Sequence, residues 1–331
     1  MLELTKRFVC AADEVWRLQR GSEPDCIAFQ SLSTGGKRIT DRGTRQGFWV
    51  FAPGAGVLSR VNSRNPERVL EVLDAGLAAW DELTEEQRAL PKDLDLTSGH
   101  RWEDNFPVGG LALERIGREL GEKGLFGERS HLWNPDYAWF TEDEWVAALP
   151  DKMQNEEVLD LTSIARRLAR FHLIDNVRGQ SLPFADSEIE IAELTATVLG
   201  GGGSATLLLR GRTRAAADDT WQLDDDSIWK PNKVIAHGME CEFTGLAIYD
   251  IRKRKFNTFD LIAVGRRWGH TVNNGRWRDP TPGRIAFHFG LAPDQPRIAP
   301  TFLSEYGVDW VVAPEVMPWR DSPTECGLEA E

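Results

Sequence analysis

The second half of the chain contains five successive segments that have the composition of β-strands, and this run constrains the fold most strongly. Short turns join two of the neighbouring pairs, with four glycines at Gly200–Gly203 and a basic turn at Lys253–Lys255. Consecutive strands with short connections pair antiparallel, which predicts a curved sheet, either a half-barrel or a sandwich. The five segments are Ile189–Leu199, Ser204–Thr213, Met239–Arg252, Phe256–Arg267 and Arg284–Leu291.

A helix is predicted immediately before these strands. Val158, Leu161 and Leu168 recur at helical spacing, and His172 continues the same apolar stripe. Asp175 follows at the expected helix exit, so His172 and Asp175 are a candidate acid–base pair. The alternative is a core histidine bonded to a neighbour, with Asp175 in a turn. Neither serine nor cysteine stands at a recognised catalytic spacing, so a nucleophilic triad lacks its nucleophile.

The first part of the chain has the pattern strand, helix, hairpin, helix. Phe8–Cys10 predicts a short buried strand, and Ser22–Leu32 predicts a helix that ends near two glycines. Gly47–Phe51 and Val57–Val61 are β-prone and enclose a Pro-Gly-Ala-Gly turn, which predicts a hairpin. Asn65 precedes a proline and an apolar face of helical period that extends to Trp80, as expected for a capped helix.

The middle of the chain has a mixed pattern that we interpret as a connector. Thr84–Gln87 and Thr141–Glu144 are capping boxes, each opening a short helix. Leu111–Leu120 carries apolar residues that favour another short helix, and Asn134–Phe140 has the composition of an aromatic loop. Trp139 in that loop is a candidate residue for binding a partner.

The segment from Phe8 to Trp80 resembles the later part of a thioredoxin-like domain. In this resemblance FVCAADE is an inner strand, GFWVFAPGAGVLSR the hairpin and NPERVLEVLDAGLAAW the last helix. With NPDYAWFTEDEW, RFHLIDNVRGQ and YDIRKRKFNTFDLIAVGRRWG, the chain is similar to a group of uncharacterised bacterial proteins that join such a domain to a β-rich one. The group has no established activity, so the resemblance implies a fold and not a function.

Two features of thioredoxin chemistry are absent from this resemblance. The four cysteines form no Cys-x-x-Cys pair, and Gly43–Gly47 stands where thioredoxins place a cis-proline. Cys10 is expected in an apolar strand and Cys26 in a helix, and neither setting lowers the pKa of a thiol. The resemblance therefore implies a platform without redox activity.

Composition excludes several classes of protein. The 331 residues suffice for two domains, and no apolar run approaches the roughly 20 residues of a membrane span. A net charge of -13 disfavours unspecific binding to nucleic acid and to anionic lipid. The start at Met1 has no signal-peptide pattern, so we expect a cytoplasmic protein or a trimmed exported chain.

Metal ligands are available near the predicted strands. His237, Glu242 and His270 offer nitrogen and oxygen donors, and Glu240 alternates with Glu242 on one strand face. A metal site needs a histidine on that same face. The alternative is that the glutamates form a solvated face of the strand.

Two further groups are candidate binding residues. Arg45 belongs to an arginine cluster around the hairpin, which is suited to an anion or to a partner's carboxylates, or to ion pairs within the chain. Trp268, Asn273 and Trp277 lie in a polar and aromatic loop of the kind that lines a sugar or small-molecule cleft.

Together these patterns predict an α+β chain in three parts. Residues 1–90 form an incomplete thioredoxin-like domain, residues 91–155 a connector, and residues 156–331 a helix followed by an antiparallel β domain. The predicted function is a redox-inactive binding or scaffold protein for a protein partner or a small molecule. The alternative is an enzyme with a histidine–carboxylate or metal site between the domains. The sequence specifies neither a ligand nor a cofactor.

Overall fold

A computed structural model describes residues 2–13, 15–34, 45–63, 65–92, 95, 97, 102–121, 133–179, 181, 183–200, 202–219, 235–271, 274–276, 279–294 and 297–302. The chain forms two compact units, residues 1–101 and residues 102–331, and each is described by itself. The first unit contains α1 (Leu2–Thr5), α2 (Val15–Arg20), α3 (Pro24–Thr34), β1 (Phe48–Ala52), β2 (Gly56–Val61), α4 (Pro66–Asp81) and α5 (Glu85–Arg88).

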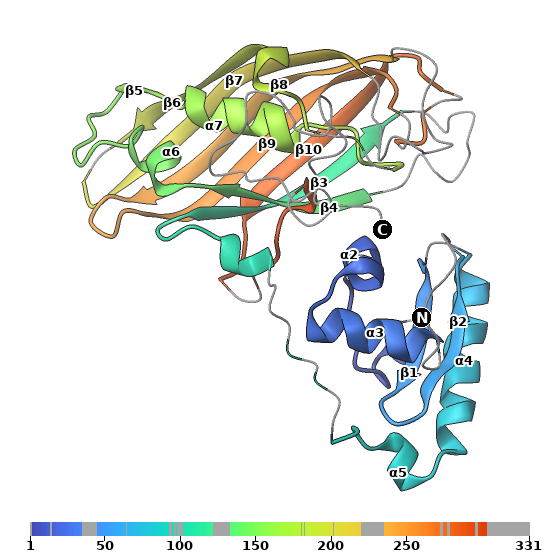
Figure 1. Ribbon diagram of the computed structural model, residues 1–331. Helices are drawn as coiled ribbons and strands as arrows, with labels where there is room; N and C mark the ends of the chain where they lie inside the picture. Colours follow the sequence, from blue (N-terminus) through green and yellow to red (C-terminus); the bar gives the residue numbers. More distant parts are fainter. Residues whose placement is uncertain are drawn as a thin grey trace. The chain divides into compact units, whose positions relative to one another are not determined.

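In the first unit an antiparallel hairpin of β1 and β2 lies between α3 and α4 (Figure 1). Trp49 and Phe51 stack with their ring centroids 5.6 Å apart, and Phe29 of α3 meets Trp49 edge-on at 5.9 Å. On the α4 side, the Ser59 hydroxyl donates to the Val72 carbonyl at 2.7 Å. Both faces of the hairpin are therefore covered by helices, which allows so short a sheet to persist.

The boundaries of α4 follow from its capping residue. The Asn65 side chain accepts hydrogen bonds from the backbone N–H groups of Glu67 at 2.8 Å and Arg68 at 3.4 Å. Pro66 occupies the first turn, where it has no N–H to leave unpaired. The predictions of the hairpin, of this helix and of the capping box at Thr84 are confirmed.

The predicted strand at Phe8–Cys10 is wrong. The Arg7 and Phe8 N–H groups donate to the Leu4 and Thr5 carbonyls, so the chain turns after α1 instead of extending. Val9 is wholly exposed and Cys10 is exposed as well. An apolar pattern of three residues does not by itself supply the pairing strand that extended backbone needs.

The second unit is built on one open sheet of eight antiparallel strands, in the order β4-β3-β10-β9-β8-β7-β6-β5. The predicted antiparallel sheet is confirmed, and its form is a single open sheet and not a sandwich. The strands are β3 (Leu111–Leu120), β4 (Trp133–Phe140), β5 (Val158–Asp160), β6 (Ile189–Leu199), β7 (Ser204–Asp219), β8 (Ile235–Asp250), β9 (Lys255–Gly269) and β10 (Gly283–Leu291).

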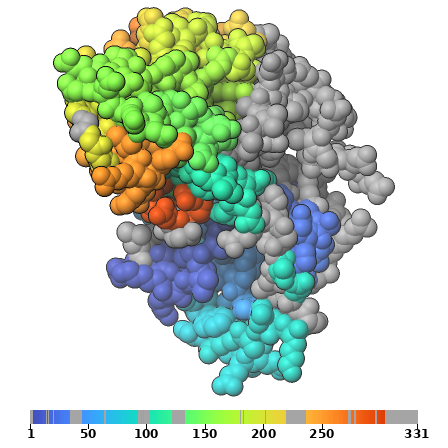
Figure 2. All heavy atoms as spheres, turned by 90° about the vertical axis from the view of Figure 1, so that its left-hand side faces the viewer, coloured from blue at the N-terminus to red at the C-terminus, as the bar shows by residue number. Residues whose placement is uncertain are grey.

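Helical segments cover one face of this sheet, which we call the inner face; the opposite side is the outer face (Figure 1). They are α6 (Glu142–Val146), α7 (Thr162–Arg167) and the π-helical segment Leu168–His172 that continues α7. In Figure 2 the part of the chain that carries α6 and α7, in green, forms a continuous surface of this unit.

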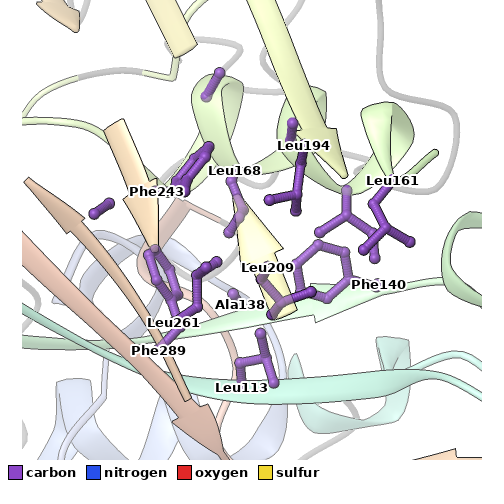
Figure 3. Packing of buried hydrophobic residues seen from close by; sticks show 14 of the residues in the cluster. Leu113, Ala138, Phe140, Leu161, Leu168, Leu194, Leu209, Phe243, Leu261 and Phe289 are labelled. Carbon is purple, nitrogen blue, oxygen red and sulfur yellow. The ribbon is translucent and has the colours of Figure 1, made fainter. Parts of the chain in front are cut away.

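The hydrophobic core lies between these helical segments and the inner face. Leu161 and Leu168 from the helical side pack toward Leu194, Leu209 and Phe243 of the strands (Figure 3). Alternate residues of each strand point inward, as the strand period of two requires. This burial is the main apolar contribution to the stability of the unit.

Three predictions in the middle of the chain are wrong. Leu111–Leu120 is strand β3 and not a helix, because β10 and β4 pair with it on both sides. Asn134–Phe140 belongs to β4 and not to a loop; Pro135 is accommodated because β4 is an edge strand. The helix expected from Val158 is partly wrong, since Val158 begins β5 and is 62% exposed.

The described helices include none that is long and apolar enough to cross a membrane. The longest of the seven α-helices in the described residues, α4, carries acidic residues along its length and packs on the hairpin.

Replacing Asn65 by alanine tests the origin of α4. The substitution removes the acceptor for two N–H groups of the first turn, so we expect the first unit to lose about 1 kcal/mol of unfolding free energy. Urea unfolding followed by circular dichroism measures this loss. Asn62→Ala, on the exposed strand end nearby, is the matched control and should leave the midpoint unchanged. Equal effects of the two substitutions would contradict the capping role.

Candidate functional site

Two groups of buried polar side chains lie on the inner face of the sheet unit. The first, which we call the arginine–carboxylate network, joins β3, β9, the turn after the π-helical segment and the loop after β9. Its charged members are Glu119, Asp175, Arg178, Arg267, Arg276 and Asp279. Three arginines face three carboxylates, so the network is balanced in charge.

Arg276 is the centre of this network and is fully buried. Its Nε and Nη2 donate to the two carboxylate oxygens of Asp175 at 2.8 and 3.0 Å, and its Nη1 donates to Glu119 Oε1 at 2.9 Å. This is the bidentate geometry in which an arginine–carboxylate bond is strongest. One side chain thereby ties the loop after β9 to β3 and to the turn after the π-helical segment.

Arg178 and Arg267 complete the network. Arg178 Nη2 donates to Glu119 Oε2 at 2.7 Å, and its Nη1 donates to Asp279 at 3.2 Å. Arg267 Nη1 donates to the Thr281 carbonyl at 2.6 Å, while its Nη2 donates to Glu119 at 3.3 Å. Burial raises the pKa of Glu119, but Arg276 and Arg178 outweigh it, so this pKa lies below its ordinary 4.5.

The second group, which we call the histidine centre, consists of His172, Arg115, Asn134 and Asp136. Arg115 on β3 is fully buried; its Nη1 donates to the Asn134 side chain, and its Nη2 donates to the Ile174 carbonyl at 3.0 Å. The guanidinium lies 4.7 Å from the ring centroid of Phe287. Gly117 lies beside this contact; a Cβ there would stand 3.1 Å from the Phe287 ring, which would have to shift by a few tenths of an ångström.

His172 ends the π-helical segment and is wholly buried. Aromatic rings surround it, with Phe302 at 5.6 Å, Phe171 at 6.3 Å and Phe140 at 6.4 Å between ring centroids. Among the described residues, neither Nδ1 nor Nε2 of this ring has a hydrogen-bond partner, and neither does Arg115 Nε. Such groups are rare in folded proteins because each costs the free energy of its lost hydration.

The charge state of His172 follows from its surroundings. Burial, and then the nearby charges of Arg115 and Arg167, hold the pKa of His172 well below its ordinary 6.5. The ring is therefore neutral at neutral pH and carries one N–H donor and one acceptor nitrogen. Asp136 accepts from the Tyr137 N–H at 2.9 Å and from the Thr301 N–H at 2.8 Å, and burial raises its pKa.

The structure places His172 and Asp175 in the same buried region without bonding them to each other. Both carboxylate oxygens of Asp175 accept hydrogen bonds from Arg276, whereas His172 lies among aromatic rings. A general base needs hydrogen-bond contact with its partners and a pKa near the working pH. His172 has no hydrogen bond to Asp175, and its pKa lies well below neutral pH.

The three metal-ligand candidates do not converge. His237 faces inward and stacks on Phe184 at 5.6 Å, whereas Glu242 on the same strand is exposed on the outer face. His270 Nδ1 lies 3.2 Å from the Thr271 carbonyl. Within the described parts of the chain, no three metal-binding side chains come together.

The binding candidates are also dispersed. The Arg45 N–H donates to the Gln19 side chain, and its carbonyl accepts from Trp49 Nε1 at 2.9 Å. Trp139 is fully buried beside Phe106, so it offers no surface to a partner. Trp268 lies on the outer face below the Arg214 guanidinium, at 5.1 Å. Asn273 and Trp277 lie outside the described residues.

The two buried thiols among the described residues, Cys26 and Cys241, are protonated at neutral pH. Burial, and then a hydrogen bond to Glu23, raise the pKa of Cys26 to about 12. Burial raises the pKa of Cys241 to about 12 as well. A protonated thiol is a poor nucleophile, so these settings do not support thiol chemistry.

Sequence reasoning missed the residues that dominate this region, namely Arg115, Glu119 and Arg276. The prediction of a helix at Leu111–Leu120 hid the alternation that sends Leu113, Arg115 and Glu119 to one face of a strand. Two charged residues on the buried face of an apolar strand are the signal that identifies such a site.

A scan with protein-family models finds no match to this chain, and comparisons with curated proteins and with solved structures find none either. The chain is therefore classified by its structure alone. It is an α+β protein with an open eight-stranded antiparallel sheet and a buried polar centre on the inner face of that sheet.

Replacing Arg276 by methionine tests the network. The change leaves Asp175 and Glu119 buried without their shared cation, so we expect the sheet unit to lose about 3–5 kcal/mol of unfolding free energy. Arg212→Met removes an exposed ion pair with Glu193 and serves as the control; its unfolding midpoint should not change measurably. Similar midpoints for the two variants in urea would refute a structural role for Arg276.

The pH dependence of stability tests Glu119 separately. Because its folded pKa is lower than in the unfolded chain, its carboxylate stabilises the fold above pH 4.5, and this contribution is lost as the pH falls through the lower folded value. Glu119→Gln should therefore destabilise the protein at neutral pH, and the difference from wild type should narrow below pH 4.5. A difference that does not change with pH would exclude this linkage.

Proposed function

We propose that this chain is a non-catalytic binding protein whose sheet unit holds a small anion in the histidine centre. The observation that carries the proposal is that three buried polar atoms of this one centre have no hydrogen-bond partner among the described residues, namely both ring nitrogens of His172 and Nε of Arg115. Native folds keep such groups rarely, and a ligand is one physical reason for keeping them. A π-helical segment, as found here at Leu168–His172, often marks a functional site.

The local charges favour an anion over a neutral ligand. Arg115 and Arg167 both act on His172, and Arg115 stays protonated although burial lowers its pKa. The nearby carboxylates already have other partners: Asp136 of the centre accepts from the Tyr137 and Thr301 N–H groups, Asp175 is bonded to Arg276, and Glu144 to Arg167. An oxygen acceptor such as a carboxylate or a phosphate would take hydrogen bonds from Arg115 and from the His172 N–H.

The same geometry argues against the rival enzyme. His172 has a lowered pKa and no carboxylate partner, so it is a weak base at neutral pH. Its ring is suited to donating a hydrogen bond to a fixed ligand. We therefore prefer binding to catalysis for this centre.

For the first unit we propose a redox-inactive platform that keeps the hairpin and last helix of the thioredoxin-like resemblance and lacks the inner strand expected at Phe8–Cys10. Support comes from the hairpin layered between α3 and α4 and from the protonated thiol of Cys26. Measurable turnover of disulfide substrates by the purified protein would overturn this part of the proposal.

Anion titration of stability tests the binding proposal. At constant ionic strength set with chloride, acetate and inorganic phosphate should raise the melting temperature of the wild-type protein along a saturable curve, as a ligand of the folded state does. His172→Phe should abolish that response. Because it replaces two unbonded buried nitrogens by carbon, it should also raise stability without anion by about 1 kcal/mol or more.

His288→Gln is the matched control, since His288 is an exposed histidine on the outer face beside Asp260. It should keep the wild-type anion response. If the melting temperatures of wild type and His172→Phe rose equally with anion concentration, the anion effect would be unspecific and the proposal would be overturned. A large loss of stability in His172→Phe would identify His172 as a structural residue instead.

A further inference from the structure

The outer face of the sheet carries three neighbouring arginines, which we call the outer arginine group: Arg118 on β3, Arg266 on β9 and Arg284 on β10. Arg284 lies directly opposite Arg266, and Arg118 lies opposite Ala286, two residues from Arg284. On a sheet these positions bring Cβ atoms within about 5 Å and about 7–8 Å of one another. The three guanidinium groups can therefore meet one ligand surface.

None of these three arginines forms an ion pair within the described parts of the chain. Arg118 instead lies over the ring of Trp133, 4.7 Å from its centroid, and Trp133 is 57% exposed. Like charges placed directly opposite each other destabilise a sheet. The directly opposed pair, Arg266 and Arg284, therefore does not stabilise the sheet.

Strand β7, which β8 separates from β9, shows the contrasting case. Arg212 on β7 is paired with Glu193, and Arg214 is paired with both Glu190 and Glu240. Glu240 lies opposite Arg266 in the register, yet its carboxylate binds Arg214. The chain has 52 acidic and 39 basic residues, yet these three adjacent arginines form no ion pair among the described residues and are available to a partner.

An exposed apolar band adjoins the outer arginine group. Ile262 and Val264 precede Arg266 on the same face of β9, and Leu246 and Ile248 extend the band on β8. These side chains are 46%, 36%, 50% and 38% exposed, respectively. A contiguous exposed apolar patch bordered by charge is typical of a protein interaction surface, where arginine and tryptophan are enriched.

We infer that this outer face binds an acidic amphipathic segment of a partner protein. The apolar side of the segment would lie on the band, and its carboxylates would accept hydrogen bonds from the outer arginine group. Nucleic acid suits the surface less well, because its phosphates would occupy the outer arginine group and leave the apolar band unused.

A second copy of this chain is also a poorer occupant. Three of the carboxylates on its outer face, Glu190, Glu193 and Glu240, are already bonded to arginines of the same chain. Glu242 and Asp260 remain on that face, so a second copy offers the outer arginine group fewer carboxylates than an acidic segment does.

The test uses two synthetic helical peptides of about 18 residues, a length at which helices can form. Both carry the same leucine stripe, flanked by glutamate in one and by lysine in the other. Fluorescence anisotropy should show the glutamate peptide binding the full-length protein at least about tenfold more tightly, with weaker binding at high salt. The double variant Arg266→Glu with Arg284→Glu should remove this preference, and Ile262→Ser should weaken binding of the same peptide.

Arg252→Glu makes the same change of charge on the exposed turn between β8 and β9 and is the matched control; it should bind as the wild type does. Equal binding of the two peptides, or equal loss in the control, would overturn the inference. If the wild-type protein bound an oligothymidine tightly and the double variant did not, the surface would be a nucleic-acid site and the inference would be overturned. Concentration-dependent dimers that the double variant disperses would identify self-association instead.

Discussion

The fully buried guanidinium of Arg276 is the interaction on which the sheet unit depends. It binds Asp175 and Glu119 at once and so joins the loop after β9, the end of the π-helical segment and strand β3. Burying these charges is favourable only because each has a partner, and removing Arg276 would leave Asp175 without its hydrogen-bonded cation. The network therefore specifies one arrangement of segments that are far apart in the chain, and the apolar core then packs around that arrangement.

The same bonds decide what the neighbouring histidine centre can do. Because Asp175 gives both carboxylate oxygens to Arg276, it is not available to orient or to charge His172. His172 stays neutral inside its aromatic surroundings, next to Arg115. A structural ion network thus leaves hydrogen-bond donors at its border, and those donors form the binding centre that we propose.

Local patterns in the sequence predicted the elements that local forces determine. The hairpin, the helix capped by Asn65 and the strands from β6 to β10 followed from turn residues, capping side chains and periodicity. Strand β3 was predicted as a helix because its leucines and isoleucine also fit helical spacing, and only pairing with β10 resolves the ambiguity. The bond between Glu119 and Arg276 spans 157 positions, and no local pattern reports it. In contrast, the separation of His237 from Glu242 follows from their odd and even positions on one strand.

The ¹⁵N chemical shifts of the two His172 ring nitrogens report whether the ring is protonated and whether it donates a hydrogen bond to an anion. This measurement is the sharpest test of the proposed binding centre. We expect a neutral ring that does not titrate near the ordinary pKa of 6.5, with a change in chemical shift at the nitrogen that donates to the anion when acetate or phosphate is added. A ring that titrates near 6.5, or one whose shifts ignore these anions while the protein stays folded, would contradict this expectation.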